Sequence, residues 1–337
     1  MATSGEDILP RVGFGGAPLG NLYAPIPEPE AVAAVAAAYD AGVRYFDTAP
    51  LYGRGLSERR IGEALRGRPR DSFRISTKVG RLLREVPGRP VDGASRDLPA
   101  LEVVYDYSED GALRSLEASL ERLSLDRVDT LFIHDIDRWT HGAAQPARFA
   151  EAMQGAYRAL RRLREEGTVT QIGVGVNEWE VCQQAAEAGD FDGFLLAGRY
   201  TLLEQEALQS FLPVCQRRGL FVVIGGPFNS GILATGAVAG ATYNYRPAPP
   251  DILARVGRIE TVCRRHRVPL AAAALQFPLA HPAVRAVIPG ARSAAEVRQN
   301  LKLLRTPLPA ALWDDLRSAA LLRSDAPTPA ADRPPTS

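Results

Sequence analysis

Four side chains that together could move a proton to or from a substrate occur in the first part of the chain: Asp47, Tyr52, Lys78 and His134. A tyrosine phenol ordinarily titrates near ~10, which is too high for a base at neutral pH. A neighbouring lysine ammonium favours the phenolate, so we expect Lys78 to lower the pKa of Tyr52. Asp47 can hold Lys78 charged and oriented, and His134 can hydrogen-bond a substrate oxygen. The set predicts that Tyr52 exchanges a proton with an alcohol or carbonyl while hydride is exchanged with a nicotinamide.

Each of these residues also has an ordinary structural interpretation. The aspartate could cap a turn, the tyrosine could pack in a loop, the lysine could reach solvent, and the histidine could be a satisfied core residue. What favours the catalytic interpretation is their order. Asp47, Lys78 and His134 each close one of three successive predicted strands, and Tyr52 follows the first of them by a few residues.

Short, continuous apolar runs alternate with longer helical patterns along the chain, as is typical of strands buried on both faces of a parallel sheet. The predicted strands are Val12–Ala17, Val43–Asp47, Phe73–Lys78, Thr130–His134, Thr170–Val174, Gly193–Ala197, Phe221–Ile224 and Ala286–Ile288. The predicted helices are Pro29–Ala41, Ser57–Arg66 with Ser57 as its N-cap, Ser108–Leu123, Pro146–Glu166, Glu178–Ala188, Gln205–Arg218, Asp251–His266 and Ser293–Leu304.

This alternation predicts an α/β fold, a (β/α)8 TIM barrel with long loops at its C-terminal face. The alternative is an open, doubly wound sheet, which would ordinarily offer a G-x-G-x-x-G turn before its first helix. Gly13, Gly15 and Gly16 lie near a predicted strand, but no helix opens directly after them. Two long irregular segments, Arg81–Asp106 and Thr235–Pro250, would leave the C-terminal ends of strands, where barrel enzymes place their active sites.

The composition excludes several classes of partner. The 337 residues carry 40 basic and 39 acidic side chains, a formal net charge of +1, which predicts no nucleic-acid or membrane partner. The three cysteines fit no metal spacing, so we expect buried free thiols and no metal.

No signal peptide or membrane span is seen, which favours the cytoplasm. We expect one domain over residues 1–323, a disordered tail over 324–337, and either a monomer or a dimer.

The motifs around the four chemical residues resemble the aldo-keto reductase family, over roughly Val12 to Leu304. The matching runs are Asp47-Thr48-Ala49, Tyr52-Gly53, Ser57-Glu58, Lys78-Val79-Gly80 and His134. Further runs resemble the bacterial NAD-dependent branch with L-fucose and D-threo-aldose 1-dehydrogenases and pyridoxal 4-dehydrogenase. They are Tyr105-Asp106-Tyr107-Ser108, His134-Asp135-Ile136-Asp137, Ala197-Gly198-Arg199-Tyr200-Thr201-Leu202-Leu203 and Gly226-Pro227-Phe228-Asn229-Ser230-Gly231.

The resemblance implies an extended dinucleotide across the barrel mouth. Asn177 matches a residue that binds the carboxamide, and the loop that starts at Pro227, Phe228, Asn229, Ser230 and Gly231 matches the segment that covers the pyrophosphate. The family's stacking tyrosine is missing, since that region reads Ile224-Gly225-Gly226, and Ala197 stands where a glutamine is common.

The last predicted strand and helix bear on the choice of dinucleotide. NADP-preferring relatives place lysine and arginine where this chain has Gly290 and Glu296. A carboxylate repels a 2′-phosphate but accepts hydrogen bonds from a ribose hydroxyl, so we expect NAD to be preferred. Arg292 is a nearby cation that could partly restore NADP binding, and Asn300 lies on the same predicted helix.

We expect a hydrated substrate pocket with polar groups and aromatic faces, which would suit a sugar ring. Its residues would be Tyr23, Asp135, Trp139, Arg199, Tyr243 and Asn244. The alternative is that these are ordinary surface residues. The expected reaction is oxidation of the anomeric carbon of an aldose of the L-fucose, D-arabinose or L-galactose type to a lactone. Two alternatives stay open: a dehydrogenase or reductase of pyridoxal or another small aldehyde, and a weakly catalytic, dinucleotide-binding regulatory subunit.

Overall fold

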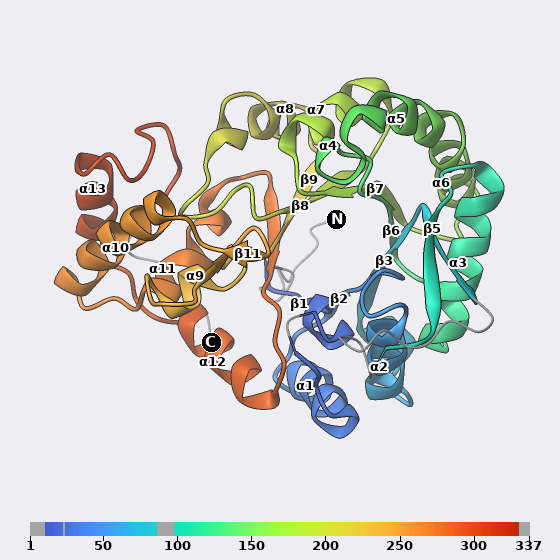
Figure 1. Cartoon of the computed structure of the whole chain (residues 1–337), viewed down its shortest axis with the longest axis horizontal. Helices are drawn as coiled ribbons and strands as arrows, with labels where there is room; N and C mark the ends of the chain where they lie inside the picture. Colours follow the sequence, from blue (N-terminus) through green and yellow to red (C-terminus); the bar gives the residue numbers. More distant parts are fainter. Residues whose placement is uncertain (1–10, 23, 86–97, 330–337) are drawn as a thin grey trace, which may run out of the picture.

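A computed structural model describes residues 11–22, 24–85 and 98–329 of the chain. Eight parallel strands lie at the centre and helices surround them (Figure 1). In sheet order the strands are β1 (Phe14–Gly15), β2 (Tyr45–Asp47), β3 (Arg74–Val79), β6 (Thr130–His134), β7 (Gln171–Val176), β8 (Gly193–Ala197), β9 (Phe221–Gly225) and β12 (Val284–Ile288). The order follows the chain, so the predicted (β/α)8 barrel is confirmed and the open sheet is wrong.

Two glycines allow the first strand to meet the last. Gly13 donates its N–H to the carbonyl of Val287 (2.9 Å), and Gly15 donates to the carbonyl of Pro289 (3.1 Å). A Cβ on Gly15 would lie 2.7 Å from the carbonyl oxygen of Ile288, a clash with backbone that cannot move aside. These glycines therefore serve the closure of the barrel rather than a phosphate-binding turn.

The described helices include α1 (Glu28–Asp40), α2 (Leu56–Leu65), α3 (Glu109–Leu123), α5 (Gln145–Gln154), α6 (Ala156–Glu165), α7 (Trp179–Ala188), α8 (Phe211–Arg218), α10 (Pro250–Arg265) and α12 (Ala294–Leu304). These confirm the predicted helices with three corrections. The single helix predicted over 146–166 is broken between α5 and α6 at Gly155, which lies against the backbone of Tyr107. The helix predicted over 205–218 starts only at Phe211. Ser57 is not an N-cap, because α2 begins one residue before it.

Several short helices carry no strong sequence signal and were not predicted. They are α4 (Arg138–His141), α9 (Ile232–Thr235), α11 (Leu270–Gln276) and α13 (Ala310–Ser318). α11 is almost uniformly apolar, so it lacks the periodicity that marks a helix at a protein surface.

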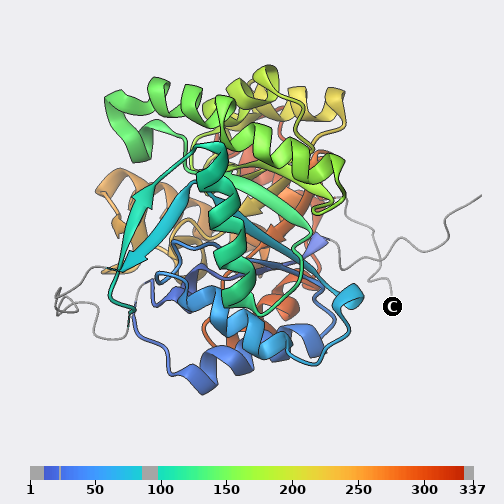
Figure 2. The same cartoon turned by 90° about the vertical axis from the view of Figure 1, so that its right-hand side faces the viewer.

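The two segments expected to be irregular each contain a β-hairpin. β4 (Arg81–Glu85) pairs antiparallel with β5 (Leu101–Tyr105), and the pair stands beside α3 (Figure 2). β10 (Thr242–Tyr243) pairs with β11 (Arg246–Pro247). The part of the first segment between Glu85 and Leu98 lies outside the described residues.

The segment expected to be a disordered tail begins with residues that pack on the barrel. Ala326 is buried, and its carbonyl accepts a hydrogen bond from the Arg317 guanidinium (3.1 Å). Arg317 also donates to the Thr328 hydroxyl (2.9 Å). Residues 330–337 lie outside the described part of the chain.

Candidate active site

The two-residue period of a strand places three of the four chemical residues inside the barrel. Phe132 belongs to the cluster that fills the barrel interior, and His134, two residues further along β6, shares its face. Tyr45 and Asp47 on β2, and Ser76 and Lys78 on β3, alternate in the same way and interact with one another across the strands. Because the eight barrel strands are parallel, Asp47, Lys78 and His134 come together at one mouth.

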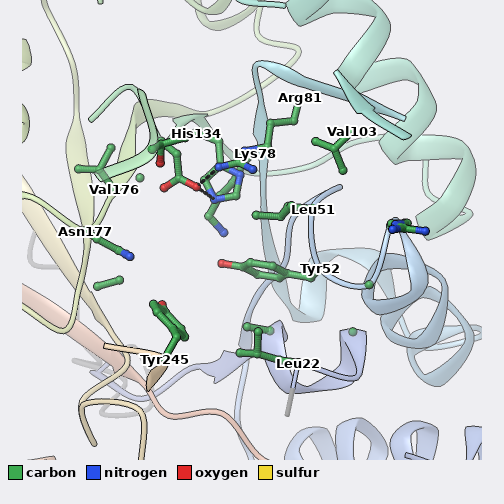
Figure 3. A pocket seen from close by; sticks show the side chains of 18 of the residues that line it. Leu22, Leu51, Tyr52, Lys78, Arg81, Val103, His134, Val176, Asn177 and Tyr245 are labelled. Atoms are coloured by element: carbon green, nitrogen blue, oxygen red, sulfur yellow. Dashed lines mark hydrogen bonds and ion pairs between the residues drawn. The ribbon is translucent and has the colours of Figure 1, made fainter. Parts of the chain in front are cut away.

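The mouth contains a cavity of about 830 Å³, a size typical of small-molecule sites. Its lining includes Tyr52, Lys78, His134, Asn177 and Tyr245. The close-up in Figure 3 shows the Tyr52 hydroxyl pointing into the cavity, with Lys78 and His134 on one side of it and Tyr245 across from it.

Lys78 and Asp47 form a buried ion pair on the floor of the cavity. The Lys78 Nζ donates to Asp47 Oδ2 (2.8 Å) and Oδ1 (3.0 Å) and to the carbonyl of Thr48 (2.8 Å). Ser76 donates its hydroxyl to Asp47 Oδ1 (2.7 Å), which fixes the carboxylate. Burial raises the pKa of Asp47, while Lys78 and then Ser76 oppose that rise. Every polar atom of the pair is therefore engaged, as a buried ion pair requires.

The loop that carries Tyr52 is anchored from both sides. Gly53 has φ +63° and lies against Gly20, so neither position leaves room for a side chain. The Ser57 hydroxyl donates to the carbonyl of Gly16 (2.8 Å), and buried Glu58 accepts from Thr77 (2.8 Å) on β3. The Ser57-Glu58 motif thus positions the Tyr52 loop over β3, and it has no direct part in the chemistry.

Tyr52 lies beside Lys78 and His134, as the predicted chemistry requires. The Lys78 Nζ is 4.7 Å from the centre of the Tyr52 ring, and the Tyr52 and His134 rings are 6.1 Å apart, edge to face. The expectation that Lys78 acidifies the phenol is not met, however. Burial raises the pKa of Tyr52 well above its ordinary value, and Asp47, Tyr245 and Asp135 add to the rise. The opposing cation is Arg81, because the charge of Lys78 is balanced by Asp47.

His134 is neutral in this setting. Burial lowers the pKa of its imidazole well below the ordinary value, and Arg81 and Lys78 lower it further. Its Nε2 lies 3.3 Å from Asp135 Oδ2, and its Nδ1 has no hydrogen-bond partner among the described residues. A neutral imidazole at the cavity wall can donate to a substrate oxygen without carrying charge.

Asn177 lies in the cavity wall just past β7. Asp137 holds its backbone, accepting from the Asn177 N–H with Oδ2 (3.1 Å) while its Oδ1 caps α4. The side chain points into the cavity (Figure 3), where an amide can pair with a carboxamide. Asp137 is thus a positioning residue.

The loop predicted to cover the pyrophosphate is only partly available to a ligand. Asn229 is buried and spends its amide on Thr201 (2.5 Å) and on the carbonyl of Gly198 (2.9 Å). Ser230 Oγ accepts from the Tyr245 N–H (3.0 Å). Gly231, by contrast, has φ +107° and open space where a side chain would be, so a ligand can approach its backbone. Pro227 is buried and the half-buried Phe228 packs against the core, so neither ring is open to a ligand as Gly231 is.

The residues predicted to select NAD lie together at the start of α12. Glu296 Oε2 accepts from the Arg292 N–H (2.8 Å), and Asn300 donates to the carbonyl of Gly290 (3.4 Å). A Cβ on Gly290 would lie 2.6 Å from Pro18, so the close contact between this turn and Pro18 requires a glycine there. The carboxylate of Glu296 is exposed beside this turn.

The residues predicted to bind substrate divide into two groups. Asp135 and Trp139 line the cavity. Arg199, Tyr243 and Asn244 do not: Arg199 donates to Asn244 (2.9 Å), and the Tyr243 hydroxyl donates to Glu204. They tie the β10–β11 hairpin to the loop after β8. Tyr23 lies outside the described residues.

Three residues at the mouth were not singled out from the sequence. Ser76 could have been found, because it precedes Lys78 by two positions on the same strand face. Arg81 and Tyr245 reach the cavity from the β4–β5 and β10–β11 hairpins. No local pattern foretells their placement, since it depends on how the hairpins fold back.

Comparison with known proteins decides the family. The family model described as "Aldo/keto reductase family" matches residues 11–320. The chain belongs to the aldo/keto reductase family.

This aldo-keto reductase is 42% identical to a pyridoxal 4-dehydrogenase from Microbacterium luteolum, covering 92% of this chain and 94% of the relative. It is 41% identical to a D-threo-aldose 1-dehydrogenase from Pseudomonas sp, covering 95% and 96%. Among solved structures, an aldo-keto reductase from Bacillus halodurans in its holo form is similar, with a TM-score of 0.71 and 25% identity over 94% of this chain and 93% of that one.

The family membership makes this protein an oxidoreductase of the dehydrogenase type, and aldo-keto reductases use nicotinamide cofactors. In the described part of the chain, no group of histidine, cysteine and acidic residues could hold a metal ion, and all three cysteines are buried free thiols. None of the helices in that part is long and apolar enough to span a bilayer.

Proposed function

We propose that this aldo-keto reductase is an NAD-dependent dehydrogenase that oxidises the anomeric carbon of an aldopyranose to a lactone. The observation that carries the proposal is the convergence of Asp47, Tyr52, Lys78 and His134 at one side of the cavity. The names of two relatives support the substrate class: D-threo-aldose 1-dehydrogenase at 41% identity and an Arabidopsis thaliana L-galactose dehydrogenase at 28%.

In the proposed reaction His134 donates a hydrogen bond to the oxygen on the anomeric carbon, and Tyr52 takes the proton of that hydroxyl. NAD, when bound, supplies the hydride acceptor and a positive ring charge, which favours a phenolate as any nearby cation does. Asp47 and Lys78 together add little net charge, so their part is to hold the floor of the cavity rigid beneath the phenol. The residues that would hold NAD are Asn177 at one end and the Gly290 turn with Arg292, Glu296 and Asn300 at the other.

Preference for NAD over NADP is supported by the charge at the start of α12. Glu296 presents a carboxylate that repels a phosphate, and Gly290 cannot become lysine without displacing Pro18. The open backbone of Gly231 suits close approach of a pyrophosphate.

A second candidate substrate is pyridoxal. The relative named pyridoxal 4-dehydrogenase has an identity as high as that of the aldose enzyme. The cavity also includes the aromatic rings of Tyr245 and Trp139, which could stack on a pyridine ring. A merely regulatory role has no support in the cavity, where the four chemical residues are assembled.

The test is a substrate panel with the purified full-length chain and each dinucleotide. L-Fucose, D-arabinose, L-galactose, pyridoxal and simple aldehydes are offered with NAD and with NADP, and lactone formation is followed alongside NADH absorbance. We expect lactone from at least one aldose, with a higher kcat/KM for NAD. If every aldose fails while pyridoxal is oxidised, the sugar assignment is wrong.

A further inference from the structure

An ion pair lies in the cavity wall beside the residues that carry the proposed chemistry. Arg81, the first residue of β4, donates with Nη2 to Oδ2 of Asp135, which follows β6. Both side chains line the cavity beside Tyr52 and His134, and both are largely buried, at 8% and 15% exposure. Figure 3 shows Arg81 and His134 reaching the same side of the cavity.

The backbone of Asp135 is held in a conformation that disfavours a side chain. Its φ is +47°, in the left-handed region. Hydrogen bonds maintain it: the Asp135 N–H donates to the carbonyl of Gly175 (3.0 Å), and the Tyr107 hydroxyl donates to the carbonyls of His134 (2.8 Å) and Asp135 (3.0 Å). Glycine would satisfy this turn with less strain.

Half of that carboxylate is unused. Both Arg81 and the His134 Nε2 face the same oxygen, Oδ2. Oδ1 makes no hydrogen bond with any residue that the structure describes, although Asp135 lines the cavity. Burial raises the pKa of Asp135 to about 6, against the influence of Arg81. At neutral pH the group is therefore an ionised acceptor that lacks part of its hydration, and a ligand hydroxyl can supply the missing hydrogen bond.

The charges of the pair select among ligands. Asp135 cancels the charge of Arg81, and its free oxygen repels anions, so the wall suits a neutral hydroxyl donor rather than a carboxylate or phosphate. The His134 Nε2 lies 3.3 Å from Asp135 Oδ2. The two side chains therefore lie next to each other in the cavity wall, and a substrate whose reacting oxygen is held by His134 has its neighbouring carbon close to Asp135.

We propose that Asp135, held by Arg81, is a specificity-determining residue that recognises the hydroxyl adjacent to the reacting carbon, which is the 2-hydroxyl of an aldose. The inference deepens the proposed function and rests on it for the sugar. The recognition itself extends to any 2-hydroxyaldehyde, so it can be tested separately.

The experiment is a cycle that removes the carboxylate charge and the hydroxyl one at a time. Wild type and Asp135→Asn are compared in the reduction of lactaldehyde and of propanal, which lacks the 2-hydroxyl. We expect Asp135→Asn to lower kcat/KM for lactaldehyde by roughly 10–100-fold, since hydrogen bonds to charged groups have this strength. Propanal reduction should fall by a smaller factor than lactaldehyde reduction, because propanal has no hydroxyl for the carboxylate to accept from. An equal loss on both substrates would overturn the proposal.

A gain of function guards against a variant that merely folds poorly. Asp135→Asn leaves the charge of Arg81 unbalanced in the cavity wall, so the reduction of glyoxylate, an anionic aldehyde, should improve by roughly tenfold. An unchanged or lower rate with glyoxylate would contradict the charge argument. The matched control is Glu102→Gln, which breaks the exposed Arg84–Glu102 pair (3.0 Å) on the same hairpin and should alter none of these ratios.

The sugar arm repeats the cycle in the oxidative direction with an accepted aldose and its 2-deoxy analogue, again expecting the loss only where the hydroxyl is present. If wild type oxidises no aldose but the lactaldehyde cycle is non-additive, the proposed function fails and the recognition by Asp135 stands. If aldoses are oxidised and both cycles are additive, the recognition fails and the proposed function stands.

Discussion

Tyr52 meets the requirements of a proton donor more readily than those of a base. Its phenol is half-buried at the cavity wall, and burial, Asp47, Tyr245 and Asp135 raise its pKa while Arg81 opposes them. Lys78 donates its hydrogen bonds to Asp47 and to the carbonyl of Thr48. The protein without cofactor therefore holds a neutral phenol, the form that donates a proton.

Replacement of Tyr52 by phenylalanine removes the proton-transfer group and little else. We expect Tyr52→Phe to lower kcat by roughly 10²–10⁴-fold, the usual contribution of acid–base catalysis. Dinucleotide affinity, followed by fluorescence, should stay within about twofold. Tyr39→Phe is the control, because that hydroxyl bonds Ser72 away from the cavity (2.7 Å). Turnover by Tyr52→Phe at the wild-type rate would refute its role.

The sequence predicts which residues meet at the candidate site, but not the pKa of Tyr52. Asp47, Lys78 and His134 close consecutive strands, and strand periodicity alone brings them to one mouth. The pKa of Tyr52 was not predictable, because it depends on how completely Asp47 neutralises Lys78 and on where Arg81 ends. Arg81 reaches the cavity because β4 pairs with β5. The sequence of this segment is irregular and does not predict that pairing.

His281 makes stability depend on pH. It is buried beneath β12, its Nδ1 accepts from the Ala283 N–H (3.1 Å), and burial lowers its pKa from 6.5 to about 4. Between these values the unfolded chain binds a proton that the folded chain does not, so stability present above pH 6.5 is lost as the pH falls.

We expect that His281→Asn, which keeps an acceptor at the same place, removes up to roughly 3 kcal/mol of the acid destabilisation between pH 6.5 and 4. Urea unfolding of both proteins across this range measures the difference. Parallel curves for variant and wild type would show that His281 does not supply the dependence.

Among the elements, α2 and α3 are packed closely at Gly62. A Cβ at this position would run into the backbone of Leu123, and backbone cannot move aside as a side chain can. Gly257 in α10 is the opposite case, since its Cβ would have only Ala237 near it, at 3.8 Å. Both glycines lie inside helices, which makes them a matched pair.

We expect Gly62→Ala to destabilise the fold by roughly 2–3 kcal/mol through overpacking. Gly257→Ala should stabilise it by roughly 0.5–1 kcal/mol, because alanine restricts the unfolded chain and favours helix. Thermal unfolding of the two variants distinguishes these effects. The idea fails if both substitutions shift the midpoint in the same direction.

Strand positions could be predicted from the sequence more completely than helix boundaries. The eight strands are short apolar runs and were all predicted, since burial on both faces leaves a plain signal. The division of the helix over 146–166 was not, because Gly155 is required by the backbone of Tyr107, far away in sequence. A glycine within a predicted helix does not by itself indicate which distant segment packs against it.

At the scale of the whole molecule, the catalytic floor and the start of α12 should serve opposite ends of one dinucleotide. Glu296→Arg replaces the repulsive charge with an attractive one. We expect it to shift the ratio of kcat/KM for NADP to that for NAD by roughly tenfold or more toward NADP. Asp251→Arg is the control, because Asp251 is also an acidic residue in the first turn of a helix, α10. An equal shift in the two variants would mean that general charge, not position, is responsible.

The closure between β1 and β12 has a consequence for the motions of the barrel. β1 has two residues, and in the described part of the chain two isolated bridges, Val12–Val287 and Gly15–Gly290, join its segment to that of β12, whereas β6 and β7 share a five-residue ladder. Local opening therefore needs fewer broken bonds at this seam than between β6 and β7. The amides of Gly13 and Gly15 should therefore exchange with deuterated solvent well before those of β6. Such a result would place local opening of the barrel where the first and last strands of the chain meet.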